Sequence, residues 1–214
     1  METEKGEVTI QTLPVGLLST NCYLVTDPES GEMLVIDPGA EPERILAAIR
    51  ASRARVVAIV NTHGHWDHIG ANGAVKEATG APLVIHAADA PWLGIIHTST
   101  RSGMHLPHPV ESPPADRLLR GEEELSLGRH RVRVIHTPGH TPGGVCLYLP
   151  GLLFAGDTLF AGSVGRTDLP GGSLSALLSA IREKLFTLPE ETVVYPGHGP
   201  TTTIGDERSL NPYV

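Results

Sequence analysis

The stretch that decides the fold runs from Val56 to Gly70 and reads VVAIVNTHGHWDHIG. The apolar, β-branched run in its first half predicts a buried strand. Its second half places three histidines and one aspartate within six positions: His63, His65, Asp67 and His68. Burying four such side chains costs free energy unless something binds them, and histidine with carboxylate is the donor chemistry of metal sites. The stretch therefore predicts a strand that ends in a metal centre.

Three more apolar strands of the sequence end in a polar side chain. VIHTPGH leads to His140, LLFAGD to Asp157 and VVYPGH to His198. Loops at strand ends gather at one edge of layered sheets and build sites there. His63 and His65 can face one ion, while the turn directs Asp67 and His68 toward a second. The two oxygens of Asp157 can bridge both ions, so we expect two divalent metals at the ~3.5–4 Å spacing of hydrolytic binuclear centres.

The predicted metal ligands are His63, His65, Asp67, His68, His140, Asp157 and His198. Asp67 and Asp157 are also the predicted catalytic residues. His140 is preferred to His136 because it lies beyond the strand, in the loop. The remaining histidines are predicted not to bind metal: His86, His97, His105, His108 and His130. Zinc is the first expectation for the metal, but iron and manganese accept the same donors.

Composition narrows the class of protein. The chain has 214 residues and a formal net charge of -8, which argues against a nucleic-acid partner. The first residues lack the apolar segment of a signal peptide, and no apolar run approaches the ~18 residues of a membrane span. The only cysteines, Cys22 and Cys146, are too few for a disulfide framework. We expect a cytoplasmic enzyme with a small-molecule substrate and no membrane partner; the oligomeric state is left open.

Strand and helix signals alternate along both halves of the chain. Short apolar runs separated by turns predict mostly antiparallel strands in each half. Helices are expected at 41–52, at 70–80 and, most strongly, at 173–189, where Ser173 is a candidate N-cap. No linker divides the halves, so residues 1–214 are expected to form one domain. Two sheets packed face to face with helices outside would bury both sets of apolar faces.

The region from Gly94 to Ala115 has no clear periodicity. It is rich in proline and weakly apolar. We expect a mobile, irregular surface loop, preceded by a helix and bordering the active site.

Taken together, the motifs resemble those of a known enzyme family. THGHWDH, TPGHTPGG, FAGDTLF and PGHG occur in this order, and VIDPG with Asp37 precedes them. The chain is identified as a member of the metallo-β-lactamase superfamily. The resemblance implies an α+β fold, a four-layer αββα sandwich of two mixed sheets. It assigns His63, His65 and His140 to a first metal and Asp67, His68 and His198 to a second, bridged by Asp157. Asp37 matches a carboxylate that orients ligands, although an aspartate before proline is also a turn former.

Within the superfamily the chain is similar to short bacterial glyoxalase II-like proteins, the hydroxyacylglutathione hydrolases. The resemblance implies a thioester hydrolase, acting on substrates such as S-D-lactoylglutathione through attack by metal-bound hydroxide. Lactamases of the common zinc class have a cysteine at the place of Asp157, which argues against antibiotic hydrolysis. The alternative is a mononuclear-iron persulfide dioxygenase, because that group also carries the string GRTD found at 165–168. A hydrolase of another ester or of a lactone stays open as well.

Arg166 matches the basic residue with which glyoxalases II contact the substrate. A guanidinium offers a planar fork for a carboxylate on a thiol carrier. The alternative is a structural ion pair with Asp168, two positions away. Two tyrosines of the glyoxalase II pattern are replaced here by Asp168 and Pro200, so the thiol is either glutathione or another carrier.

Overall fold

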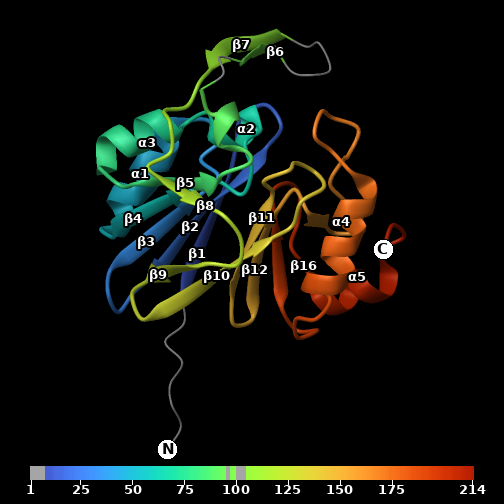
Figure 1. Cartoon of the computed structure of the whole chain (residues 1–214). Helices are drawn as coiled ribbons and strands as arrows, with labels where there is room; N and C mark the ends of the chain where they lie inside the picture. Colours follow the sequence, from blue (N-terminus) through green and yellow to red (C-terminus); the bar gives the residue numbers. More distant parts are fainter. Residues whose placement is uncertain (1–7, 95–96, 100–104) are drawn as a thin grey trace, which may run out of the picture.

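A computed structural model describes residues 8–94, 97–99 and 105–214. Its first half forms a sheet of six strands in the order β1-β2-β3-β4-β5-β8 (Figure 1). The strands are β1 (Thr9–Val15), β2 (Thr20–Asp27), β3 (Glu32–Ile36), β4 (Arg55–Val60), β5 (Leu83–His86) and β8 (Arg117–Leu119).

The second half forms another sheet of six strands, in the order β16-β15-β12-β11-β10-β9. Its strands are β9 (Glu124–Leu127), β10 (His130–His136), β11 (Val145–Leu149), β12 (Leu152–Gly156), β15 (Val193–Pro196) and β16 (Thr202–Thr203). Two small hairpins complete the described strands: β6 (His97–Ser99) with β7 (His105–Val110), and β13 (Leu159–Phe160) with β14 (Ser163–Val164).

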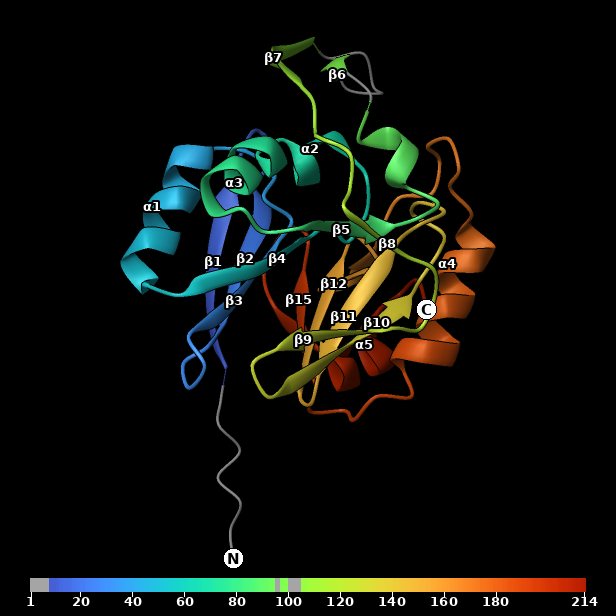
Figure 2. The same ribbon diagram turned by 60° about the vertical axis from the view of Figure 1, so that its left-hand side comes forward.

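Apolar side chains alternate between the two faces of each sheet and so build separate cores. In β2, Leu24 packs toward the helices α1 (Pro42–Ser52) and α3 (Asn72–Thr79), while its neighbour Tyr23 packs between the sheets. In β11, Leu147 faces the same central core and Cys146 faces the helices on the other side. This period of two covers both faces of both sheets. The expected αββα sandwich is confirmed (Figures 1 and 2).

The helix predicted at 41–52 begins and ends close to where the sequence places it, whereas the helix predicted at 173–189 is shorter: its α-helical part ends at Ala180 and a π-helical segment continues only to Leu185. Pro42 occupies the first turn of α1, and Gly80 follows α3 in a left-handed conformation. Ser173 caps α4 (Leu174–Ala180), its hydroxyl accepting the N–H of Ala176. A single π-helical segment, η2 (Ile181–Leu185), continues α4, and α5 (Ile204–Leu210) ends the chain's regular structure.

The pairing of the first sheet departs from the expectation of mostly antiparallel strands. β3 pairs with β4, β4 with β5 and β5 with β8, all in parallel. Helix α1 links β3 to β4 and helix α3 links β4 to β5, and such crossovers return the chain in the same direction. As a result, the carboxyl ends of β3 and β4 lie at the same edge as the loops that carry the histidines.

The prediction of an irregular loop from Gly94 to Ala115 is also wrong in part. The region contains the hairpin β6–β7, which projects from one end of the molecule beyond α2 (Trp66–Ile69). The segment before it is a short 3-10 turn, η1 (Ala90–Trp92), where a longer helix was expected. Pro107 and Pro109 argue against a strand in the sequence, but a two-stranded hairpin has only edge strands, which tolerate residues without an N–H. Residues 95–96 and 100–104 lie outside the described part of the chain, and the expected mobility stays a prediction.

Within the described residues, no helix is long and apolar enough to cross a membrane.

Candidate metal centre

All seven predicted ligands converge at one edge of the sandwich. His63 and His65 follow β4, and Asp67 and His68 belong to the short helix α2. The other three come from the second sheet, where they follow β10, β12 and β15: His140, Asp157 and His198. The sequence expectation that strand-end loops meet in space is therefore confirmed for these side chains.

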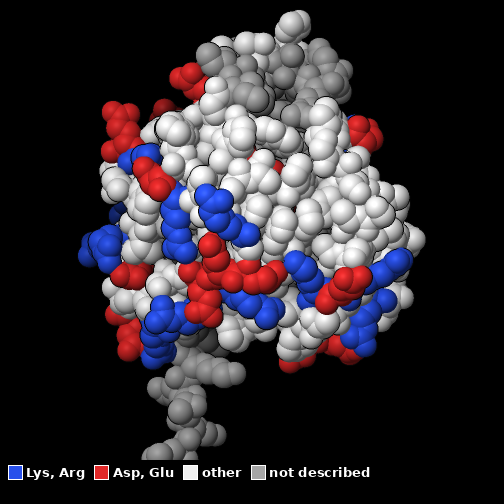
Figure 3. Space-filling view, viewed as in Figure 1, with Lys and Arg blue, Asp and Glu red and all other residues white. Residues whose placement is uncertain are grey.

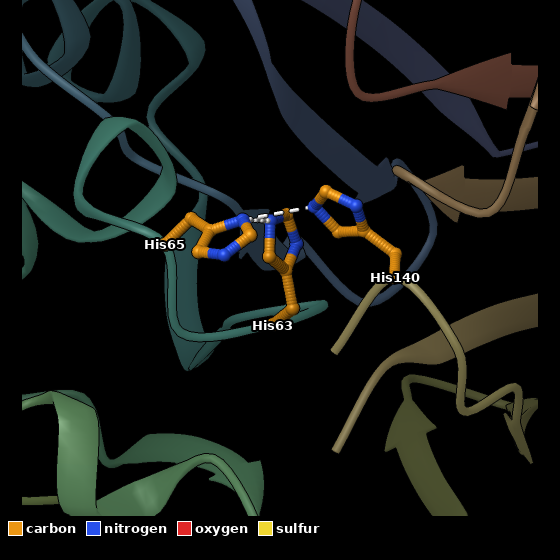
Figure 4. Close-up of side chains that lie close together, drawn as sticks. All are labelled: His63, His65 and His140. Atoms are coloured by element: carbon orange, nitrogen blue, oxygen red, sulfur yellow. Dashed lines mark hydrogen bonds between the residues drawn. The ribbon is translucent and has the colours of Figure 1, made fainter. Parts of the chain in front are cut away.

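The first cluster joins three histidine rings (Figure 4). His65 Nδ1 lies 3.1 Å from His63 Nε2 and 2.8 Å from His140 Nε2. The rings meet nearly edge to face, with interplanar angles of 80° to 87°. Three ring nitrogens thus point at a common position from different directions, as the ligands of one metal ion do.

The second cluster joins Asp67, His68 and His198. Asp67 Oδ2 lies 3.4 Å from His68 Nε2 and 3.3 Å from His198 Nε2. The two ring nitrogens are 3.4 Å apart. The hydroxyl of Thr20 donates a hydrogen bond of 3.1 Å to the same Asp67 oxygen and so fixes its orientation.

Asp157 lies between the two clusters. Its Oδ2 is 3.5 Å from His140 Nε2 in the first cluster, and its Oδ1 is 3.4 Å from His68 Nε2 in the second. Among the described residues, no donor forms a hydrogen bond with the buried Oδ1. Gly197 makes room for this oxygen, because a Cβ there would collide with it. The carboxylate is therefore placed where one oxygen can serve each cluster.

The ring nitrogen that points away from the clusters is held in four of the five histidines. His140 Nδ1 lies 2.7 Å from the carbonyl of Arg166, and His198 Nδ1 lies 3.1 Å from that of Leu18. A carbonyl accepts, so the proton is on Nδ1 and the lone pair of Nε2 faces the cluster. His63 Nδ1 contacts the Thr62 hydroxyl at 3.1 Å.

Asp37 holds the remaining ring and a neighbouring loop. One carboxylate oxygen accepts from Thr62 N–H at 2.7 Å, and the other from the Thr62 hydroxyl at 2.6 Å. That second oxygen also lies 3.0 Å from His68 Nδ1. Asp37 has a φ of 49°, so it is both the turn residue and the orienting carboxylate that the sequence left as alternatives. Asp37, His63 and His68 also lie close enough together to hold a cation, but binding one there would break the hydrogen bonds that Asp37 makes with Thr62 and His68.

Charges distinguish the two clusters. Burial and the neighbouring His68 lower the pKa of His63, which favours the neutral form of this ring in the first cluster. Burial also disfavours a charged His68, but Asp67, Asp157 and Asp37 outweigh it and raise its pKa to about 10. The same attraction from His68 and His198 lowers the pKa of Asp67 against the effect of burial. The second cluster is thus a concentration of buried negative charge that attracts cations.

The loop that carries His198 is held by two residues that the sequence analysis missed. Asn21 donates from Nδ2 to the carbonyls of Pro196 and Gly199, at 3.0 and 2.9 Å. The Tyr23 hydroxyl donates to the Pro196 carbonyl at 2.6 Å. Both lie in β2, a strand whose sequence looks purely structural, and their partners are more than 170 residues away. No local pattern could have identified them.

Arg166 forms the ion pair that was its alternative reading. Its guanidinium makes two hydrogen bonds with the Asp168 carboxylate, at 2.8 and 2.7 Å. This pairing lowers the pKa of Asp168 to about 2. The two side chains are 56% and 67% exposed, so the pair contributes little stability. Substrate contact by Arg166 stays a prediction.

The histidines predicted not to bind metal are outside both clusters wherever their side chains are described. His86 stacks on His136 with a centroid distance of 4.2 Å and an interplanar angle of 10°, and neither ring belongs to a cluster. His130 faces Asp27 at 4.0 Å, at the end of β2 away from Thr20. His105 is exposed in β7. The side chains of His97 and His108 lie outside the description.

Two relatives match nearly the whole chain. A probable metallo-hydrolase of Bacillus subtilis, YqgX, is 40% identical and covers 94% of this chain and 95% of its own length. The hydroxyacylglutathione hydrolase GloC of Haemophilus influenzae is 35% identical over 96% of this chain and 97% of its own.

Solved structures agree with the fold. The B3 metallo-β-lactamase BLEG-1 superposes with a TM-score of 0.89 at 38% identity, covering 96% of this chain and 99% of its own. TTHA1623 in a di-iron-bound form gives 0.84 at 40% identity, with coverages of 95% and 100%. ETHE1 from Myxococcus xanthus gives 0.78 at 31% identity, with coverages of 95% and 83%. A family model described as the metallo-beta-lactamase superfamily matches residues 15–198. The ordered motifs, the four-layer sandwich and these matches agree: the chain belongs to the metallo-β-lactamase superfamily.

Proposed function

We propose that this protein is a metal-dependent hydrolase of thioesters, with S-D-lactoylglutathione as the representative substrate. The observation that carries the proposal is the pair of clusters linked by Asp157. One is built from three ring nitrogens and the other from two rings and a carboxylate. The similarity to GloC supports the choice of a thioester.

The residues fit two divalent ions. Five rings and two carboxylates supply a formal charge of -2, and two such ions supply +4. His63, His65 and His140 would hold one ion, and Asp67, His68 and His198 the other, with Asp157 shared. Zinc, iron and manganese all accept these donors, and the di-iron form of TTHA1623 shows that iron is used by a similar protein. Zinc remains our choice for this chain.

Bound divalent ions supply a nucleophile at neutral pH, by lowering the pKa of water to roughly 7, and stabilise a developing oxyanion. The chain's own residues keep the donors in place. Asp37 and the carbonyls of Leu18 and Arg166 fix the ring orientations. The side chain of His198 is 26% exposed, more than that of Asp67, Asp157, His140 or His68. Substrate therefore approaches the centre from the side on which His198 lies.

A thioester suits such a centre because its leaving group needs no help. A simple thiol has a pKa near 8.5 and departs as the thiolate. An amide leaving group would require a proton donor. The backbone carbonyl of Arg166 binds the ligand His140, so Arg166 lies next to the first cluster. Its guanidinium would leave Asp168 and pair with a carboxylate of the thiol carrier when substrate binds.

The test is hydrolysis of S-D-lactoylglutathione by zinc-loaded protein, followed by thiol release with a chromogenic disulfide. We expect turnover that disappears in Asp157→Ala. A neutral ester, a lactone and a cephalosporin are assayed in parallel, the last because BLEG-1 is a lactamase. Turnover of one of these without turnover of any thioester would overturn the proposal.

Persulfide dioxygenation is the second candidate, favoured by the similarity to ETHE1 over 95% of the chain and by the string at 165–168. That chemistry uses a single iron, whereas here a second cluster of Asp67, His68 and His198 is assembled with donor atoms 3.3 to 3.4 Å apart. An oxygen electrode with glutathione persulfide and iron-loaded protein separates the two. Oxygen uptake without thioester turnover would establish the dioxygenase.

Charge on the surface argues for a small substrate. On the face shown in Figure 3, Lys and Arg are interspersed with Asp and Glu over the lower half. That face offers no extended basic surface for a nucleic acid.

A further inference from the structure

The carboxylate of Asp89 joins two loops that the sequence keeps far apart. Asp89 is fully buried, directly before η1. Its Oδ2 accepts the backbone N–H of Gly64 at 3.0 Å, and its Oδ1 accepts that of Gly143 at 2.6 Å. Each oxygen therefore has its own partner, 25 positions away in one case and 54 in the other.

Both partners sit inside the loops of the first cluster. Gly64 lies between His63 and His65, and Gly143 lies three positions after His140. The first loop follows β4 in one sheet, and the second connects β10 to β11 in the other. The Asp89 carboxylate thus joins the two loops, one from each sheet, that carry the three rings.

Both glycines lie so close to Asp89 that a side chain would collide with it at Gly143 and be tightly confined at Gly64. A Cβ at Gly143 would lie 2.6 Å from Asp89 Oδ1, and one at Gly64 would lie 3.1 Å from the Asp89 carbonyl oxygen. That carbonyl accepts the N–H of Trp92, whose ring stacks on His65 at 5.4 Å and 18°. The segment from Asp89 to Trp92 therefore holds the His63–His65 loop through both its backbone and a ligand ring.

We propose that Asp89 is a positioning residue, which sets the separation between the His63–His65 pair and His140 and so the geometry of the first metal site. The inference rests on the proposed metal centre. A carboxylate is needed because both partners are donors and each requires an acceptor. Asparagine would keep one acceptor and place an NH₂ group against the other N–H, leaving a buried donor unsatisfied. The loops would then separate, and the three nitrogens with them.

The experiment compares Asp89→Asn with the wild type in zinc affinity, by chelator competition, and in the visible spectrum of the cobalt-loaded protein. We expect the ion held by the three histidines to bind about 10- to 100-fold more weakly, the scale of lost ligand-orienting contacts. We also expect a changed cobalt spectrum, while the ion at Asp67, His68 and His198 keeps its affinity. Asp27→Asn is the matched control, because Asp27 is also buried and accepts a backbone N–H at 3.0 Å, at the end of β2 opposite to Thr20. It should lower the melting temperature without changing either metal readout.

A second variant and a measurement on the wild type guard against a misfolded Asp89→Asn. Gly143→Ala should reproduce the spectral change, since the new methyl displaces the carboxylate. In the zinc-loaded wild type, the amides of Gly64 and Gly143 should exchange slowly with deuterium. Rapid exchange of both, or an Asp89→Asn protein with wild-type affinity and spectrum, would overturn the role of Asp89. A wild type that binds no zinc or cobalt would instead overturn the metal centre itself.

Discussion

Asp37 Oδ2 and His68 Nδ1 lie 3.0 Å apart, and both side chains are buried. The same carboxylate binds the hydroxyl and the N–H of Thr62, whose hydroxyl contacts His63. One residue thus orients a ring in each cluster. Asp37 therefore connects the two clusters through hydrogen bonds, although it belongs to neither set of ligands.

Replacing Asp37 with asparagine should weaken both metal sites. Asparagine tolerates the φ of 49°, so the turn is kept while the charge and one acceptor are lost. We expect a decrease of about 10- to 100-fold in zinc affinity at both sites, measured by chelator competition. Asp116→Asn is the control, because Asp116 binds Lys76 and the Leu83 N–H away from the clusters. Wild-type affinities in Asp37→Asn would show that the contact does not matter for binding.

The two aspartates of the clusters should differ in what their loss removes. Asp157 contacts both clusters, so Asp157→Ala should reduce zinc content at both sites and abolish activity. Among the ligand rings, Asp67 contacts His68 and His198, both of the second cluster. Asp67→Ala should therefore lower the zinc content from two ions per chain toward one. Elemental analysis of reconstituted protein measures both. Full activity at one ion per wild-type chain would contradict a binuclear centre.

Arg166→Ala should raise KM for an anionic thioester and leave a neutral thioester nearly unaffected, if the guanidinium binds substrate. Asp168→Ala is the paired variant: it frees the guanidinium and should lower KM for the anionic substrate. Because the ion pair is exposed, the melting temperature should change little in either protein. An equal loss on both substrates would remove Arg166 from substrate binding and leave it a structural residue.

The two cysteines should not react in the folded protein. Both are buried and unpaired, and burial raises the pKa of Cys146 to about 11 and that of Cys22 further. Since the thiolate is the reactive form, we expect no labelling by a chromogenic disulfide under native conditions and two thiols per chain after denaturation. Rapid native labelling would contradict the packing of β2 and β11. The result also matters for the thioesterase assay, which uses the same reagent.

The sequence by itself determined most of the strands and helices, the αββα architecture and the identity of the clustered donors, but not the hairpin β6–β7 or the π-helical segment η2. The apolar runs of β2 and β11 predict strands that are buried on both faces, as they are. The motif around His63 is local, so its spacing is visible in one stretch. Asp37 could be placed near the ligands, but its two roles could not be separated until its partners were known.

Only the tertiary structure decided how those donors are held. The parallel pairing of β3, β4 and β5 depends on crossovers that composition does not distinguish from turns. Asn21 and Asp89 lie in segments without any metal-site pattern, and they act through backbone groups of residues 25 to 178 positions away. A hydrogen bond to a backbone group cannot be deduced from the partner's residue type, because every residue offers the same carbonyl and every residue except proline the same N–H. The sequence therefore identifies the donor residues, whereas their relative positions are set only when the two sheets pack together.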